Sequence, residues 1–491
     1  MPDAGLMEFL NRRHPAYGER EDVYKFLGQS YEGGAQWIES NLFRFSPRET
    51  HQDYKRRRDQ AVYPNLVKRT LGIYRDHVFK EGDSLRRDIT HPAWEEFRDN
   101  VDRDRSNANQ FWGSVAIRAM LYGWMGVLVD APRLPDLGRP MTMADVQAGV
   151  ATPYFVAVSP LEIADWSCDP FGALNWVHLV QTQMQDAEPY TRRTEATIHR
   201  VYDRAGWRVY DDKGVLLDDG VHKLGVVPFV VARIDPSEFH QCIGTSFMED
   251  YARMNRALAN SISLRHDFLA KNALQILTVQ IQGMADDDDN AEQMVVRNLL
   301  EYTGERPPQW VGPDVSGAEW MFRHVEDLLG WMRMMASLQD VDVQTMAPQS
   351  GIAKLVDFEQ TNAALSAFAD AIEGAETEAT RLWFIWQGIE WDKAWRIDYP
   401  DTFNVRSLTD EIAQAHEVRG LYGDLSPTLV REYLRELAAR LLDAAEPETL
   451  EQIESELTEN AANHVEEAVF AGRVRRERLA GEETPDEEMA V

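Results

Sequence analysis

The 491-residue sequence predicts an α+β protein with a mixed α/β body, two long helices around a small β-containing insert, a very long helix and a helical C-terminal bundle. Residues 153–235 contain several short β-strand patterns. Helical patterns at 246–272 and 318–339 enclose the insert. A third pattern runs from 354 to 387 without an internal proline, which gives a rod of roughly 50 Å at ~1.5 Å per residue.

The charge balance limits the classes of function. The chain has 82 acidic and 51 basic residues and a net charge of −31. Tight nucleic-acid binding needs Lys and Arg to neutralise phosphates, so the composition argues against it as a global function, although DNA could still pass close by. It also argues against a basic membrane-surface protein. A hydrophobic fraction of 44% is enough for a real core.

No segment predicts membrane insertion or export. No apolar run is long enough to span a bilayer, and the first residues lack the basic and apolar regions of a secretory signal. Cys168 and Cys242 are the two cysteines of the sequence. So few in so long a chain argue against a disulfide framework and fit a reducing cytoplasm.

The N-terminal third is expected to be mainly helical after a loop. Residues 1–50 predict a short first helix and then a loop through Gly33 and Gly34, and residues 51–82 predict a basic pair of helices. The run Lys55–Arg58 could touch phosphate, but a solvated face or pairing with neighbouring acids is favoured.

A buried strand is expected next. A helix at 107–124 leads through Gly123 and Gly126 into an apolar strand ending at Asp130. Helix, glycine and apolar strand form a packing device, and no Gly-rich loop follows to cradle a nucleotide. Five later segments predict an antiparallel sheet: 154–158, 176–180, 197–202, 207–210 and 226–231.

The insert at 273–317 opens with a strand at 274–281. Its framing helices would place it at the far end of a stalk. Asp286, Asp287, Asp288 and Asp289 form an acidic run whose oxygens suit calcium. The run lacks the spacing and the distal Glu of a calcium loop, so a solvated acidic loop is favoured.

The long helix has one apolar face, whose small and apolar positions recur every three or four residues. They are Leu355, Phe358, Leu365, Ala369, Ile372, Ala379, Trp383 and Trp386. Asn362 and Glu376 interrupt this face, so the helix either kinks there or meets a polar neighbour. Residues 405–480 predict helices without lysine, and the acidic tail 481–491 predicts disorder.

No sequence pattern of an enzyme, cofactor site or metal site is present. The pairs His77 and His91, and His222 and His240, are expected to be surface or packed residues rather than ligands. Asp398 and Asp401 flank a turn, where Asp is common for backbone reasons. A cytosolic hydrolase with an acidic site therefore remains only a weaker alternative.

The order of these elements resembles that of the portal (head–tail connector) proteins of tailed phages, over residues ~50–460. The residues that match best lie in five segments: 122–130, 227–229, 350–354, 357–359 and 375–376. The resemblance implies a non-enzymatic ring of about twelve subunits at one capsid vertex, built in the host cytoplasm. Double-stranded DNA would pass through it, and terminase, a head-completion or adaptor protein and the major capsid protein would bind it.

The resemblance also implies a role for each region. Residues 1–245 and 354–404 would form the wing, 246–272 and 318–340 the stem, 273–317 the clip, 341–353 the tunnel loop and 405–480 the crown. The tunnel-loop residues facing DNA would be Gln344, Thr345, Gln349, Ser350 and Lys354. The docking residues of the clip would be Asp286 to Asp289, Arg306 and Trp310. Another virion scaffold or assembly protein is the main alternative.

Overall fold

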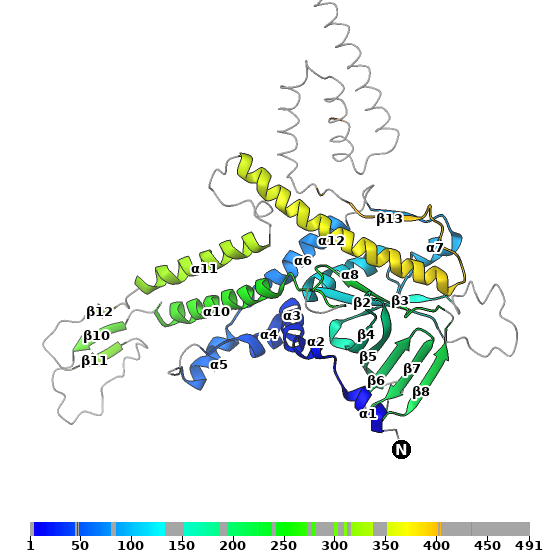
Figure 1. The fold of residues 1–491 in the computed structure, drawn as a ribbon. Coiled ribbons are helices and arrows are strands. Elements are labelled where there is room, and N and C mark those ends of the chain that lie inside the picture. The colour runs from blue at the N-terminus through cyan, green and yellow to red at the C-terminus, as the bar shows by residue number, and fades with distance from the viewer. Residues whose placement is uncertain are drawn as a thin grey trace, which may run out of the picture. The chain divides into compact units, whose positions relative to one another are not determined.

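The computed structural model describes most of residues 4–403. The segments left out are 45–46, 48, 80–84, 133–151, 186–189, 191–193, 223, 238–241, 273–275, 281–298, 303–308, 312–315, 337–350 and 401–402, and side chains are described neither for 271–318 nor for 337–361. The chain forms two units, 1–403 and 404–491. All elements below belong to the first, so the predictions for 405–480 and 481–491 lie outside the described residues. Helices and sheets are mixed, which confirms the α+β class (Figure 1).

Six helices form the N-terminal part. They are α1 (Ala4–Asn11), α2 (Pro15–Gly18), α3 (Glu21–Glu32), α4 (Gly34–Asn41), α5 (His51–Asp59) and α6 (Leu66–Val78). The loop predicted up to residue 50 is therefore wrong over most of its length. Gly33, with φ of 69°, ends α3 and begins α4 instead of opening a long loop. Tyr24, Leu27 and Trp37 are buried on these helices.

Two capped helices lead into the central strand. In α7 (Pro92–Phe97) the His91 side chain accepts a hydrogen bond from the Ala93 amide. In α8 (Ala108–Tyr122) Asn107 and Gln110 form a capping box. Gly123, with φ of 89°, then turns the chain directly into β2 (Trp124–Asp130).

A three-stranded antiparallel sheet has the order β3-β2-β9, with β3 at Tyr154–Val158 and β9 at Phe229–Arg233. Two of the matching segments meet here, because Leu128 on β2 pairs with Phe229 on β9. A Cβ atom at Gly126 would lie 2.2 Å from Cζ of Phe229. The glycine therefore makes room for the aromatic ring, as the predicted packing device requires.

A five-stranded antiparallel sheet has the order β4-β5-β6-β7-β8. Its strands are β4 (Ile163–Cys168), β5 (Leu174–Gln185), β6 (Thr194–Asp203), β7 (Gly206–Asp211) and β8 (Leu216–Val221). The antiparallel prediction is confirmed, but the strands divide between two sheets. Cys168 and Cys242 form a disulfide. The sequence argued against a disulfide framework and did not predict this single pair, which joins positions 74 residues apart.

The two framing helices are α10 (Glu249–Asn272) and α11 (Ser316–Met335). Between them lie β10 (Ile276–Gln280), β11 (Leu299–Tyr302) and β12 (Gln309–Val311). Strand β10 is central, parallel to β11 and antiparallel to β12.

The long helix α12 covers Gly351–Trp386 and ends near Gly388, whose φ is 72°. It packs on α6, α8, β2 and β9. Strand β13 (Arg396–Asp398) then pairs with β1 (Arg86–Asp88). The second half of α12 therefore packs across one face of the three-stranded sheet (Figure 1).

Candidate functional site

Helices α10 and α11, together called the stalk below, pack side by side (Figure 1). The sheet β10–β12 follows α10 and precedes α11 within a few residues. It therefore lies at the end of the stalk where α10 ends and α11 begins. On α11 one face is buried at Val325, Leu328 and Met332, and buried Ala336 just after the helix continues it. These positions recur every three or four residues, as expected for a helix that packs against one neighbour.

Buried polar side chains hold α10 to the N-terminal helices. Asn255 donates to the Tyr63 hydroxyl at 2.7 Å. Asn260 donates to the Asn41 carbonyl at 3.2 Å and accepts from the Phe43 amide at 2.7 Å. Both asparagines are almost fully buried and out of reach of water. Each hydrogen bond therefore gives a buried polar group the partner that water cannot supply. The root of the stalk is therefore specified by polar contacts and not by apolar packing alone.

The basic run on α5 is part of this root. The Arg57 side chain is 2% exposed, pairs with Glu49 at 2.8 Å and reaches Ser263 on α10 at 3.4 Å. Arg56 pairs with Asp267 on α10 at 3.2 Å. The favoured interpretation, pairing with neighbouring acids, is thus confirmed for these two arginines. Their charge is used to brace α10.

The two polar residues on the apolar face of α12 meet polar partners. Asn362 accepts from the Phe403 amide at 2.6 Å. Glu376 is fully buried and binds Arg87 of β1 through two hydrogen bonds of 2.6 and 3.2 Å. The Tyr399 hydroxyl donates to the same carboxylate at 2.5 Å. The prediction of a polar neighbour is therefore confirmed at both positions.

Electrostatics keep Arg87 and Tyr399 of this buried cluster protonated. Burial alone would lower the pKa of Arg87, but the Glu376 carboxylate overcomes it and raises that pKa. Burial and then Glu376 raise the pKa of Tyr399 well above its ordinary value. Arg87 stays charged and Tyr399 stays a neutral donor near pH 7. The cluster is suited to joining α12 to β1 and β13, and not to proton transfer.

The predicted DNA-facing and docking residues are for the most part outside the described residues. This holds for Gln344, Thr345, Gln349, Ser350, Asp286, Asp287, Asp288, Asp289 and Arg306. Lys354 lies in the first turn of α12 and Trp310 lies in β12, paired in register with Leu277, but neither side chain is described. The roles of all these residues stay predictions.

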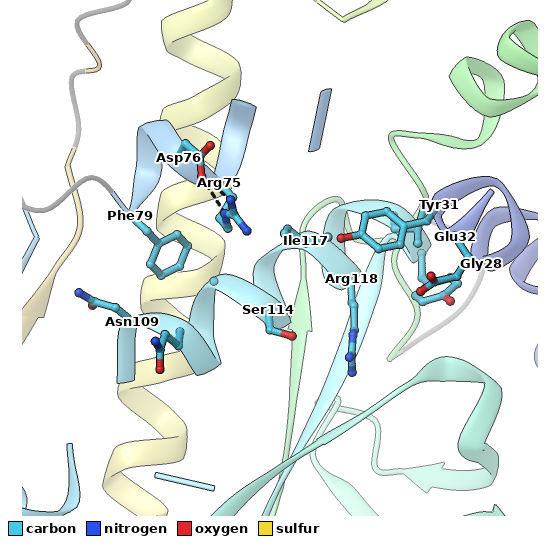
Figure 2. Close-up of a pocket in the computed structure, with 14 residues that line it drawn as sticks. Gly28, Tyr31, Glu32, Arg75, Asp76, Phe79, Asn109, Ser114, Ile117 and Arg118 are labelled. Carbon is cyan, nitrogen blue, oxygen red and sulfur yellow. Dashed lines mark hydrogen bonds and ion pairs between the residues drawn. The ribbon is translucent and has the colours of Figure 1, made fainter. Parts of the chain in front are cut away.

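A cleft of about 670 Å³ opens between α3, α6 and α8 (Figure 2). Its charged lining has both signs, and the Arg75 guanidinium is already held by Asp76 at 2.6 and 2.8 Å. Glu32 and Arg118 add one further charge of each sign. The cleft therefore has neither the converging carboxylates of a hydrolase nor the cationic lining that a phosphate ligand needs.

Other candidate residues behave as packed groups. Burial raises the pKa of Asp130, which accepts weak hydrogen bonds from the Tyr154 and Tyr202 hydroxyls at 3.3 and 3.4 Å. His222 is buried, and its Nε2 atom lies 3.0 Å from the Asp203 backbone carbonyl oxygen. Asp398 is exposed on β13. Within the described ranges, no three His, Cys, Asp or Glu side chains gather as a metal site would require, and no helix could cross a membrane.

Comparisons with known proteins found no match among protein-family models or curated proteins. Among solved structures, a chain from the neck of an empty gene transfer agent (GTA) particle, computed with C6 symmetry, is 11% identical, with a TM-score of 0.39. The alignment covers 78% of this chain and 91% of that one. A chain from the virion of the native gene transfer agent particle is 12% identical, with a TM-score of 0.36 and coverages of 79% and 94%. Such scores do not establish a shared fold, so function is inferred from the chain's own geometry.

Proposed function

We propose that this chain is a portal-type connector subunit, with about twelve copies forming a ring through which double-stranded DNA passes. The observation that carries the proposal is the stalk: a pair of helices rooted in the body by buried polar contacts and ending in a small sheet. Such a projection buries little of its own surface within one chain. Neighbouring copies that stand side by side in a ring would bury that surface. The chain would then be a counterpart of the particle-neck and virion chains compared above.

The uncovered side of α11 supports lateral packing. Trp320 is 74% exposed, Trp331 52% and Met334 57%. On a helix of 3.6 residues per turn these three positions share one face, away from the face that packs on α10. Exposed aromatic side chains in such a row mark an interaction surface. In the proposed ring, the stem of a second copy covers this row.

The charge of the chain suits a conduit. A ring multiplies the net charge of −31 by its number of copies. Acidic walls repel phosphate, and the Debye length of ~8 Å is comparable with a narrow gap between duplex and wall. DNA can then slide without being held. In the proposal, residues 341–353 line the narrowest part, and the sheet β10–β12 offers the docking site for terminase and then for an adaptor protein.

The first expected result is a discrete, ring-shaped oligomer of the purified full chain. Light scattering should give one large particle of about twelve chains, and negative-stain images should show a central hole. A monodisperse monomer under assembly conditions would exclude the proposal. A closed or filamentous assembly without a hole would support the alternative of another virion scaffold protein.

A second prediction concerns the loop before α12. Deleting Met346 to Ser350 should leave the ring intact and impair DNA packaging or retention, because these residues are proposed to contact the passing duplex and not the neighbouring subunit. The ring is checked by light scattering and the DNA content by nuclease protection. Deletion of the acidic run Asp286 to Asp289 tests a different step, since it should weaken the binding of terminase to the ring, which a binding assay with purified rings can follow separately from DNA content. Collapse of the ring without Met346 to Ser350 would instead show a structural clamp.

A further inference from the structure

Two histidines lie side by side in the five-stranded sheet, outside everything the proposed function uses. Nε2 of His178 on β5 is 3.0 Å from Nδ1 of His199 on β6, and the rings stack at 5.2 Å. His178 is fully buried and His199 is 7% exposed. The other ring nitrogen of His178, Nδ1, is buried and has no hydrogen-bond partner among the described residues.

Helix α1 covers this pair. Phe9 stacks on His178 at 5.2 Å and meets Trp176 edge-on at 5.4 Å. The Arg12 guanidinium lies over the Phe9 ring and pairs with Asp165 of β4. Helix α1 lies beside this sheet (Figure 1), and its Phe9 ring covers the ring of buried His178.

The charges around the pair oppose its protonation. The positive charges of Arg12 and Arg13, in the segment after α1, disfavour a proton on His178, and that of Arg13 also disfavours one on His199. Asp211 and Asp212 at the end of β7 act on His199 in the opposite sense. Burial, then His199 and these arginines, lower the pKa of His178 to about 3. Burial and then Arg13 also lower the pKa of His199.

We propose that the His178–His199 pair makes the docking of residues 4–14 on the sheet acid-labile, holding the segment while both rings are neutral and releasing it when they gain protons. When both rings are neutral, one N–H lies between His178 Nε2 and His199 Nδ1 and forms the hydrogen bond that joins them. A proton added to His178 leaves a buried N–H without an acceptor, beside two arginines. After release the rings meet water and regain an ordinary pKa near 6.5.

The direction with pH follows from the lowered pKa. Docking is fully present above the ordinary value near 6.5 and weakens as the pH falls toward the docked value of about 3. For His178 alone, the equilibrium shifts up to tenfold per pH unit, or about 30-fold at pH 5. The lowered pKa of His199 adds to this in the same direction.

Hydrogen–deuterium exchange of the full chain at pH 7.5, 6.0 and 5.0, corrected for the intrinsic exchange rate, tests the proposal. Amides of α1 should open at least about 30-fold more at pH 5.0, while those of α3 keep their protection. The variant His178→Gln/His199→Gln keeps an amide hydrogen bond without a titrating group and should stay docked at pH 5.0. His14→Gln is the matched control, since His14 stacks on Trp166 in the same segment and should not be needed for the response.

Unchanged α1 exchange at pH 5.0, or loss of the response in His14→Gln, would overturn the proposal. Should the double variant lack native circular dichroism at pH 7.5, Phe9→Ala decides instead. Because Phe9→Ala weakens docking, residues 4–14 should then be released at a higher pH. An unchanged pH midpoint of release would overturn the proposal.

Discussion

Replacing Glu376 with alanine is expected to lower the free energy of unfolding by about 3–5 kcal/mol, the typical cost of breaking a buried ion pair. Arg87 would remain buried with a full charge and no carboxylate, since its other partners, Asn109 and Tyr399, are neutral. The Tyr399 hydroxyl would lose its acceptor as well. The loss should appear as a lower midpoint in urea unfolding followed by circular dichroism.

A matched control lies on the same helix. Glu378 is exposed and contacts Arg381 at 4.0 Å, so Glu378→Ala should change stability by less than about 0.5 kcal/mol. The double variant Arg87→Met/Glu376→Met should recover much of the loss, because apolar replacement of both partners removes the uncompensated charge. Equal effects of the two alanine variants would show that Glu376 contributes only helix propensity.

This cluster marks how far sequence reasoning goes. The three- and four-residue spacing predicted the buried face of α12, and Leu365, Ala369 and Ile372 are indeed buried. The same spacing marked Glu376 as a polar residue on an apolar face. It could not name Arg87, which lies 289 residues away in sequence. Local patterns predict faces, whereas partners depend on the fold.

The missed elements have physical reasons of the same kind. Strand β8 is mostly exposed, so it lacks the apolar alternation that identifies a strand, and it exists because β7 pairs with it. The pairing of His178 with His199 depends on the register between β5 and β6, which alternation within each strand does not fix. The disulfide likewise depends on how β4 meets the segment before α10.

The candidate site was predictable in outline only. The stalk helices and the central strand of the insert follow from periodicity and strand patterns, and their bounds differ from the structure by a few residues. The buried Asn255 and Asn260 were not predicted as its root, because polar residues on a helix ordinarily suggest a solvated face. Only their contacts with Tyr63, Asn41 and Phe43 explain why they are buried.

The other large effect is expected at Trp383, where substitution by alanine should lower the free energy of unfolding by about 3–5 kcal/mol. This side chain is fully buried, stacks on Phe97 at 4.3 Å and meets Trp94 edge-on at 6.1 Å. Its indole N–H donates to the Pro153 carbonyl at 2.9 Å. Alanine would leave a cavity between α12, α7 and β3 and an unsatisfied buried carbonyl.

Two further variants separate these contributions. Trp383→Phe keeps an aromatic ring against Phe97 but loses the N–H, so it should cost about 1–3 kcal/mol in urea unfolding. Ile385→Ala changes a neighbouring side chain that is 38% exposed on α12 and should cost less than about 1 kcal/mol. If Trp383→Ala lowered the free energy of unfolding no more than Ile385→Ala, the C-terminal half of α12 would not be part of the packed core.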